Sequence, residues 1–379
     1  MSAGRLRILH LHSGNMMGGI ESMLLTLAEC AHLSPEFEQQ FALVFDGEFA
    51  ATLREKHATV HLLPLVRLRH LPSIMRSRHQ LAALLKQNHF DAVIAHSSWT
   101  QLIFANVVRQ SDIPLLFWMH GPFDGHWLQK LASFQPPDFV ICNSEWTRST
   151  LDRCYPRVPS TIMYYPVSPR QSSRTRDEVR RELGVDPDET LILMAARMEP
   201  WKGHRQLLRA LPLIRSQLRW RVLIAGGPNT PRETGYFESL KREASELDLS
   251  AKVRFLGYRS DVSALMMAAE IHCQPNEQPE PFGIVFVEAL QAGVSVVTFA
   301  MGGPREILDR NTGILVPPGD LAGLAAALSR LIENPKLRSG LGMAGPARAQ
   351  ALCDPAQQIQ MFKNTVQNVI ARGKGAAIA

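Results

Sequence analysis

Short apolar runs that look like strands alternate with longer helix-like stretches along nearly the whole chain. In the first half these runs are residues 7–12, 41–45, 92–96, 115–120 and 139–143. The alternation is typical of a parallel sheet covered by helices, because parallel strands need long crossover connections between them. The sequence therefore predicts an α/β fold.

The alternation is interrupted where the polar, Ser-rich segment VSPRQSSRTRD occupies residues 167–177. Apolar runs then resume at residues 191–195, 221–225, 253–256, 271–274 and 295–299. A chain of 379 residues is long enough for two hydrophobic cores, so we predict two Rossmann-like, doubly wound parallel-sheet domains facing a cleft. The predicted divisions are an N-terminal domain at 1–168, a linker at 169–180, a C-terminal domain at 181–354 and a helix at 355–379 that packs back toward the first domain.

The composition limits the kinds of partner. A formal net charge of +6 favours anionic ligands, but without a Lys- or Arg-dense tail we expect no nucleic acid. The five cysteines are scattered without a C-x-x-C pair, which argues against a disulfide framework or a thiolate zinc site and fits a reducing cytoplasm. No apolar run approaches the roughly 20 residues of a spanning helix, so any membrane contact is expected to be peripheral.

A glycine-rich turn follows the first apolar run, in SGNMMGGIE at residues 13–21. There Gly18 and Gly19 would let backbone N–H groups approach a phosphate at the start of a helix. The spacing differs from the dinucleotide-binding fingerprint, and an ordinary tight turn remains the alternative.

Two cations, Arg197 and Lys202, follow the run at 191–195 and stand just before a predicted helix. Fixed positive charges at such a place suit a diphosphate whose negative charge grows as it departs. Gly226 and Gly227 end the next predicted strand and permit close approach of a ligand. A solvated surface role for one cation and an ordinary turn at the glycines remain open.

Two glutamates bracket an apolar segment, Glu280 before it and Glu288 within it, with Phe282 and Gly283 between them. A carboxylate buried in such surroundings needs a partner, because an unpaired buried charge is costly. Sugar hydroxyls would serve, and a structural ion pair with an arginine is the alternative.

In their order and spacing these pieces resemble retaining glycosyltransferase family 4. The likeness rests on Arg197 with Lys202-Gly203, Gly226-Gly227-Pro228, Phe255-Leu256-Gly257, Glu280 and Glu288 with Pro281-Phe282-Gly283, Gly302-Gly303-x-x-Glu306 and Gly18-Gly19-Ile20-Glu21.

The resemblance implies the GT-B architecture, with a nucleotide diphosphate sugar held mainly by the second domain. Carried over by position, Arg197 and Lys202 would bind the diphosphate, Glu280 the hydroxyls of the transferred sugar and Glu288 the ribose. Gly18 and Gly19 would approach the donor, and His120 resembles the family's histidine near the reacting sugar.

The reaction implied by the family is transfer of a hexosyl unit from a UDP- or GDP-sugar to a glycan or glycolipid acceptor with retention of configuration, in cell-surface polysaccharide assembly. No metal or other cofactor is expected, and the D-x-D at Asp186 and Asp188 is interpreted as a turn. A nucleotide-sugar epimerase and a catalytically silent nucleotide-sugar-binding subunit are the alternatives.

The first domain, which would select the acceptor, has no acidic residue between Glu55 and Asp91 but several basic ones. Within it, residues 72–87 have helical apolar spacing at Ile74, Leu81, Leu84 and Leu85. A basic amphipathic helix can dock on anionic lipid, which would place the enzyme in the cytoplasm at the inner face of the membrane through residues 67–86. A helix packed on the domain with a solvated basic face is the alternative.

Overall fold

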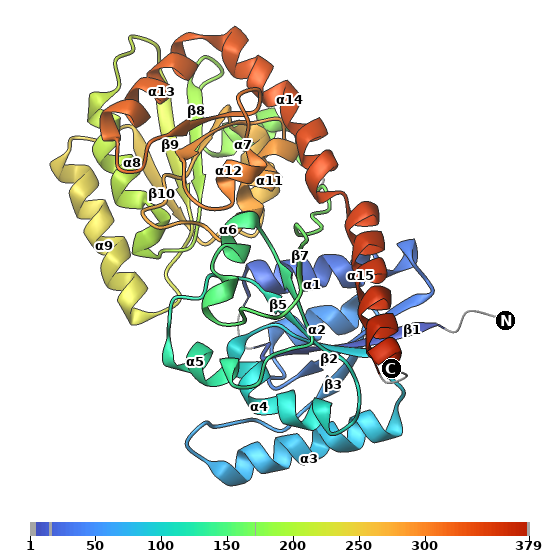
Figure 1. Ribbon diagram of the computed structural model, residues 1–379. Coiled ribbons are helices and arrows are strands. Elements are labelled where there is room, and N and C mark those ends of the chain that lie inside the picture. The colour runs from blue at the N-terminus through green and yellow to red at the C-terminus, as the bar shows by residue number, and fades with distance from the viewer. Residues whose placement is uncertain (1–4, 15–16, 171, 377–379) are drawn as a thin grey trace. The chain divides into compact units, whose positions relative to one another are not determined.

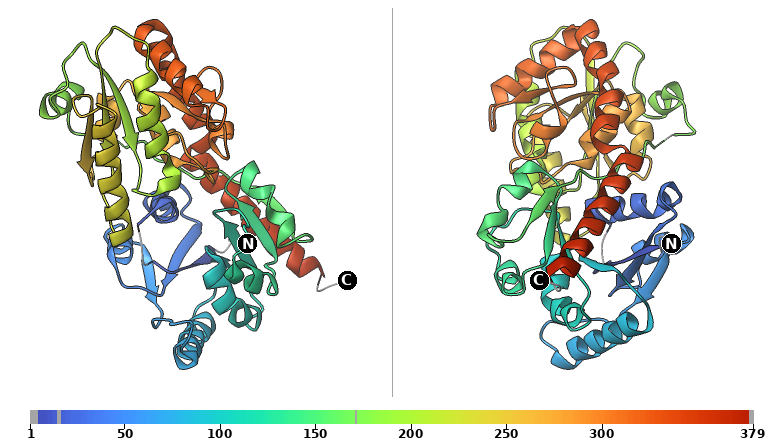
Figure 2. Two further views of the ribbon diagram at one scale, coloured as in Figure 1. Left: turned by 90° about the vertical axis from the view of Figure 1, so that its left-hand side faces the viewer. Right: turned by 45° about the vertical axis from the view of Figure 1, so that its right-hand side comes forward.

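The computed structural model describes residues 5–14, 17–170 and 172–376, which fold into two compact units (Figures 1 and 2). The first unit comprises residues 1–168 and 353–379, and the second comprises residues 169–352. Asn15 and Met16 of the predicted glycine loop lie outside the described residues, as do the outermost residues of the predicted first domain and C-terminal helix and residue 171 of the predicted linker. The prediction of two doubly wound parallel-sheet domains is confirmed.

In the first unit, the described residues form a parallel sheet of seven strands in the order β3-β2-β1-β4-β5-β6-β7. Its strands are β1 (Leu6–His12), β2 (Phe37–Leu43), β3 (Thr59–Leu62), β4 (Ala92–Ala95), β5 (Leu115–Met119), β6 (Phe139–Cys142) and β7 (Ser160–Ile162). Its helices are α1 (Gly19–Glu29), α2 (Glu48–Glu55), α3 (Leu71–Gln87), α4 (Ser98–Arg109), α5 (Trp127–Ser133), α6 (Glu145–Arg148) and α15 (Pro355–Ala376), with 3-10 turns η1 (Ala31–Leu33) and η2 (Leu151–Arg153).

Helix α15 belongs to the first unit although it lies at the end of the chain. It packs against α1, and Phe362 is fully buried with its ring 5.1 Å from that of Phe37 and 5.0 Å from that of Trp118. Lys363 forms an ion pair with Glu36. Burying an aromatic ring of this size contributes roughly 1.5–3 kcal/mol, so this contact anchors the helix to the sheet.

In the second unit, the described residues form a parallel sheet of six strands in the order β10-β9-β8-β11-β12-β13. Its strands are β8 (Thr190–Ala195), β9 (Trp220–Ala225), β10 (Val253–Gly257), β11 (Ile271–Cys273), β12 (Ser295–Phe299) and β13 (Gly313–Val316). Its helices are α7 (Arg176–Glu182), α8 (His204–Ala210), α9 (Pro231–Glu246), α10 (Val262–Ala268), α11 (Ile284–Gln291), α12 (Pro304–Ile307), α13 (Leu321–Glu333) and α14 (Pro335–Cys353), with 3-10 turns η3 (Pro200–Lys202) and η4 (Leu211–Leu213).

Both sheets reverse their winding direction between two central strands. The reversal lies between β1 and β4 in the first unit and between β8 and β11 in the second. In open parallel sheets the loops that leave the carboxyl ends of such strands diverge and leave room for a ligand. The loops after β8 and β11 carry Lys202 and Glu280, so the fold places both side chains at this position.

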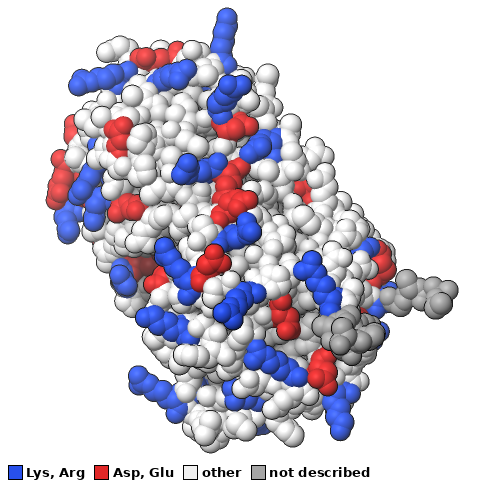
Figure 3. All heavy atoms as spheres, in the orientation of Figure 1, with Lys and Arg blue, Asp and Glu red and all other residues white. Residues whose placement is uncertain are grey.

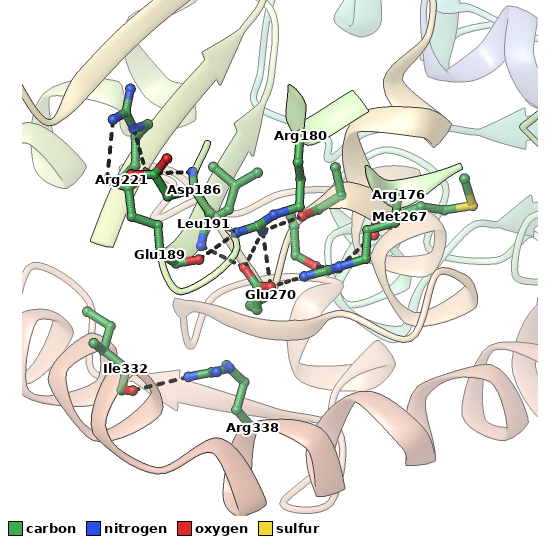
Figure 4. A network of polar contacts seen from close by, with 12 residues as sticks. Arg176, Arg180, Asp186, Glu189, Leu191, Arg221, Met267, Glu270, Ile332 and Arg338 are labelled. Atoms are coloured by element: carbon green, nitrogen blue, oxygen red, sulfur yellow. Dashed lines mark hydrogen bonds and ion pairs between the residues drawn. The ribbon is translucent and has the colours of Figure 1, made fainter. Parts of the chain in front are cut away.

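The segment predicted as a linker, 169–180, enters the second unit, because its later part is the start of α7. Figure 4 shows how this helix is tied to the sheet through Arg180 and Glu270. Arg180 is 5% exposed and donates to the carboxylate of Glu270 at 3.2 Å and to the carbonyl oxygens of Asp186 and Glu189 at 2.6 and 2.7 Å. α7 is therefore an integral part of the second unit.

Among the helices of the described residues, none combines the length and apolar character that a membrane crossing requires.

Candidate functional site

Lys202 is held at the carboxyl edge of the second sheet by the glycine that follows it. Gly203 has φ +84°, and a Cβ added there would lie 1.8 Å from the carbonyl oxygen of Pro275. Only glycine tolerates both the left-handed backbone and this approach. The turn after β8 therefore lies directly against the loop that leaves β11.

The ammonium of Lys202 forms an ion pair with the carboxylate of Glu280, with Nζ and Oε2 2.7 Å apart. Their side chains are only 13% and 11% exposed, so the pair is largely withdrawn from water. Nζ also lies 3.8 Å from the centre of the Trp201 ring, a cation–π contact. The structure thus brings together two of the residues that the sequence singles out, one for phosphate and one for sugar.

Two amides that the sequence interpretation missed extend this pair. Asn276 donates from Nδ2 to Oε2 of Glu280 at 3.0 Å, and Gln274 donates from Nε2 to Oδ1 of Asn276, also at 3.0 Å. Both are almost fully buried. Their position just after β11 (Ile271–Cys273) is the sequence signal that could have pointed to them, because polar residues that follow a buried strand face the carboxyl edge of the sheet.

The backbone of Glu280 is fixed by the glycine pair after β12. The amide of Gly303 donates to the carbonyl oxygen of Glu280 at 2.8 Å, and a Cβ at Gly302 would lie 2.2 Å from that oxygen. The Gly302-Gly303 pattern therefore serves to let two loops pack in direct contact, which holds the Glu280 side chain in place.

Arg197 and Glu288 have partners of their own among the described residues. Arg197 is 42% exposed and lies 3.2 Å from Glu199. Glu288 lies 3.9 Å from Arg170 and lines a pocket of about 370 Å³ between α10 and α11. Burial raises the pKa of Glu288 above its ordinary value, and the positive charge of Arg170 partly offsets this.

The remaining residues predicted to bind the donor in this unit are Gly226, Gly227, Phe282 and Gly283. Gly226 has φ +150° and lies against Ala196, and Gly227 lies against Tyr258, so neither position has room for a side chain. Gly283 begins α11 with φ +102°. Phe282 is only 2% exposed, so its ring is part of the interior of the unit.

In the first unit, Gly18 and Gly19 stand at the start of α1, next to a buried acidic side chain. Gly18 caps the helix, and Glu21 in its first turn lies 2.6 Å from Nε2 of His12. Both side chains of that pair are less than 10% exposed. The sequence interpretation treated His12 as a plain strand residue and missed this contact.

His120 follows β5 and lines a second pocket of about 310 Å³. Its Nδ1 lies 2.5 Å from the hydroxyl oxygen of Tyr165, and its Nε2 lies 2.8 Å from Nδ1 of His96. His96 in turn contacts His10 at 2.7 Å. Both ring nitrogens of His120 therefore have partners inside the first unit.

The apolar residues that gave α3 its helical spacing do not form a free surface. Leu81, Leu84 and Leu85 are at most 9% exposed and belong to the core of the first unit. Arg78 is likewise tied down, because it donates to the backbone carbonyls of Leu102 and Ile103. The expectation that this apolar face is available to lipid is wrong, because that face packs on α4.

The comparisons with known proteins identify the family of the chain. Residues 17–170 match the family model "Glycosyltransferase Family 4", and residues 175–348 match "Glycosyl transferases group 1". This chain belongs to the family 4 glycosyltransferases with the GT-B fold. The glycosyltransferase also resembles a crystal structure of Anabaena Alr3699/HepE in complex with UDP and glucose, with a TM-score of 0.83 and 24% identity over 96% of this chain and 100% of that one. At this identity the likeness establishes the fold.

Two of the curated relatives come from Corynebacterium species. The glycosyltransferase is 33% identical over 186 residues to the D-inositol 3-phosphate glycosyltransferase of Corynebacterium efficiens, which covers 48% of this chain and 42% of the relative. It is 26% identical over 367 residues to a GDP-mannose-dependent monoacylated alpha-(1-6)-phosphatidylinositol monomannoside mannosyltransferase of Corynebacterium glutamicum, covering 88% of this chain and 90% of that one. The chain thus spans less than half the length of the first of these relatives.

The D-x-D at 186–188 has an ion-pair partner. Arg219 contacts the carboxylate of Asp186 and lies 3.1 Å from that of Asp188. Across the described residues, no group of three or more His, Cys, Asp or Glu side chains is arranged to hold a metal ion.

Proposed function

We propose that this glycosyltransferase moves a hexosyl unit from a UDP- or GDP-sugar to a glycan or glycolipid acceptor with retention of configuration, in the assembly of cell-surface polysaccharide. The observation that carries the proposal is the buried pair of Lys202 and Glu280 at the carboxyl edge of the second sheet. A cation suits the departing diphosphate, and a carboxylate beside it suits the hydroxyls of the attached sugar.

In the proposed reaction the acceptor hydroxyl oxygen bonds to the anomeric carbon on the face from which the diphosphate oxygen departs. The hydroxyl proton passes to the leaving diphosphate, so the protein supplies no covalent nucleophile. Its contribution is positioning and stabilisation of the negative charge that develops on the leaving group. Lys202 is suited to this because Glu280 and Trp201 fix its ammonium before the donor binds.

The other residues have proposed roles that follow the family resemblance. Arg197, which is partly exposed, would bind the diphosphate beside Lys202. Glu288 would bind the ribose hydroxyls from the wall of its pocket, displacing its weak contact with Arg170. From the first unit, Gly18 and Gly19 would approach the donor and His120 the transferred sugar.

The relatives support both donor classes. One is a GDP-mannose-dependent mannosyltransferase, and the fold resembles a protein crystallised with UDP and glucose. The named curated relatives also act on inositol phosphate or phosphatidylinositol mannoside, which supports a phosphorylated or lipid-linked acceptor.

A donor screen tests the proposal. The full chain is incubated with UDP-, GDP- and ADP-sugars, with and without acceptor extracts, while free nucleotide diphosphate and glycosylated product are measured. Stoichiometric release of both is expected. Interconversion of the donor without a glycosylated product would indicate an epimerase, and donor binding without turnover would indicate a silent subunit.

We expect activity to survive chelation, because the two cations at the diphosphate position do the work that a divalent metal does elsewhere. Turnover with the best donor is measured before and after treatment with EDTA, followed by gel filtration. Loss of turnover that magnesium or manganese restores would contradict the proposed role of Arg197 and Lys202.

We further propose that the first unit contacts anionic membrane through a patch at the start of α3 and the loop before it. Leu65, Leu68, Leu71 and Met75 are 38–65% exposed there, and Arg67, Arg69 and Arg76 are exposed beside them. In Figure 3 the region of α3 at the bottom is covered by uncharged (white) and basic (blue) side chains. Apolar side chains that enter the interface and cations that meet anionic headgroups are the two components of peripheral docking.

Replacing Arg67 and Arg69 together by alanine is expected to weaken binding to anionic vesicles by roughly thirtyfold at low salt, since each basic residue near the surface contributes about 1 kcal/mol. Co-sedimentation with phosphatidylserine-containing and neutral vesicles at two salt concentrations measures this. The matched control is alanine at Lys241 and Arg242, which are exposed on α9. Absence of binding at both salt concentrations removes the membrane proposal and leaves the transfer reaction untouched.

A further inference from the structure

Three histidines of the first unit form one continuous hydrogen-bonded chain. His10 lies on β1, His96 follows β4 and His120 follows β5, three strands that are neighbours in the sheet. Nδ1 of His10 lies 2.7 Å from Nε2 of His96, and Nδ1 of His96 lies 2.8 Å from Nε2 of His120. The rings of His96 and His120 stack at 5.1 Å with an angle of 17°. His96, in the middle, thus contacts His10 through Nε2 and His120 through Nδ1.

The hydrogen-bonded row of three histidines ends in groups that indicate which way its hydrogen bonds point. At one end Gln39 is oriented with its amide oxygen, which can only accept, 3.1 Å from Nε2 of His10, and this orientation assigns a proton to that nitrogen. A neutral His10 then accepts at Nδ1 from His96, and a neutral His96 accepts at Nδ1 from His120. All three rings are therefore assigned the tautomer with the proton on Nε2.

The other end is compatible with the same direction. Asn143 donates from Nδ2 to the carbonyl oxygen of His120 and to the hydroxyl oxygen of Tyr165, each at 3.1 Å. The orientation of this amide is set by the carbonyl, which can only accept. With the proton of His120 on Nε2, the hydroxyl of Tyr165 donates to Nδ1 of His120 at 2.5 Å while it accepts from Asn143. Both ends therefore fit one arrangement of protons.

Protonating His10 or His96 would place an N–H group against another N–H group, and a proton on Nδ1 of His120 would require the hydroxyl of Tyr165 to turn its own proton away, so the geometry opposes a positive charge. Burial acts in the same direction: it lowers the pKa of His10 to about 4 and the pKa of His96 and His120 well below the ordinary value. The other titratable groups that face the three rings are Tyr165 and the pair of His12 and Glu21, and the remaining neighbours are Gln39, Phe41, Trp118 and Phe362. Among them, His12 is paired with the carboxylate of Glu21, and its electrostatic effect adds to burial in lowering the pKa of the three rings.

We propose that His10 and His96 are positioning residues that hold His120 as a neutral imidazole with its proton on Nε2, so that an uncharged ring borders the pocket assigned to the sugar. This inference rests on the proposed function, in which positive charge develops on the transferred sugar. An imidazolium at that place would repel the developing charge, whereas a neutral, ring-stacked imidazole does not. His10 and His96 thus set the charge of His120 without contacting the substrate themselves.

Nuclear magnetic resonance of the full chain with ¹⁵N-labelled histidine tests the assignment directly. At neutral pH, His10, His96 and His120 are expected to show protonated Nε2 and unprotonated Nδ1, and to remain neutral when the pH is lowered to about 5.5. A proton on Nδ1 of His120, or an imidazolium that forms near the ordinary pKa of about 6.5, overturns the proposal.

Gln39→Glu supplies the functional arm of the test. A carboxylate of nearly the same shape at the end of the chain stabilises an additional proton, so the acid-side midpoint of the turnover–pH profile is expected to rise by at least about one pH unit. The KM for the donor should change little. Gln360→Glu, an exposed substitution of the same kind on α15, is the matched control and should leave the profile in place. An unchanged acid-side midpoint in Gln39→Glu overturns the proposal.

Different results would contradict the proposed function and the positioning role of His10 and His96. A protein with the expected tautomers that transfers no sugar in the donor screen contradicts the proposed function and leaves the proton arrangement intact. A protein that transfers sugar but carries a cationic or Nδ1-protonated His120 contradicts only the positioning role of His10 and His96.

Discussion

Lys202→Ala is expected to lower turnover by at least about a hundredfold, the scale of removing one preorganised group that stabilises developing charge. The ammonium is only 13% exposed and is held by Glu280 and Trp201, so it needs no reorganisation when negative charge grows on the diphosphate. Because that charge is larger in the transition state than in the bound donor, kcat should fall by more than KM rises. Steady-state kinetics with the best donor from the screen measures both constants.

Lys202→Ala also removes the cation beside the buried carboxylate of Glu280, which keeps its hydrogen bond from the amide of Asn276. The double variant Lys202→Ala/Glu280→Gln separates this effect from the loss of phosphate binding, because it removes the uncompensated charge. If the double variant recovered wild-type turnover, Lys202 would be a structural partner of Glu280 and not a ligand of the diphosphate. Lys241→Ala, at an exposed lysine paired with Glu238 on α9, is the control and should be neutral.

The sequence predicted the central strands of both sheets well and missed strands at the edges. Central strands such as β8 and β12 are buried on both faces and read as continuous apolar runs. The missed strands β3, β7 and β13 are edge strands of only three or four residues, and each is partly exposed. Runs this short show too little periodicity to be distinguished from loops.

The helix predicted after Lys202 is short in the structure. α8 ends at Ala210 and gives way to the 3-10 turn η4, which contains Pro212. A proline near a helix end favours the tighter turn because it removes a backbone donor and restricts the residue before it.

The candidate site was predictable in its residue types and only partly in its partners. Lys202 and Glu280 were identified from their order along the chain, but nothing in that order says that they form an ion pair, because they are 78 residues apart. The polar chain from Gln39 to Tyr165 was harder to foresee. Its members come from separate strands and loops, and it exists only because the sheet order places β1, β4 and β5 side by side.

Arg180→Met is expected to destabilise the second unit by about 3–5 kcal/mol, the usual result of removing one partner of a buried ion pair. Arg180 joins three parts of this unit: α7, the turn before β8 and the turn before β11 (Figure 4). Without its guanidinium, the carboxylate of Glu270 loses a partner, and the carbonyl oxygens of Asp186, Glu189 and Ala268 lose their donor. Methionine replaces much of the volume, so the loss reflects polar groups left without partners more than an empty cavity.

Because the chain has two compact units, one unfolding midpoint would mix their contributions. Hydrogen exchange followed by mass spectrometry resolves them, since peptides from residues 169–352 report the second unit and peptides from residues 5–14 and 17–168 report the first. Protection should fall by roughly two to four orders of magnitude, which corresponds to about 3–5 kcal/mol, in the peptides of the second unit alone. Arg181→Ala, at the exposed arginine next along α7, should change protection by no more than about 0.5 kcal/mol. An equal loss in the two variants would mean that the buried contacts of Arg180 do not stabilise α7 on the sheet, and the helix would then be held by the apolar packing of Val179 and Leu183.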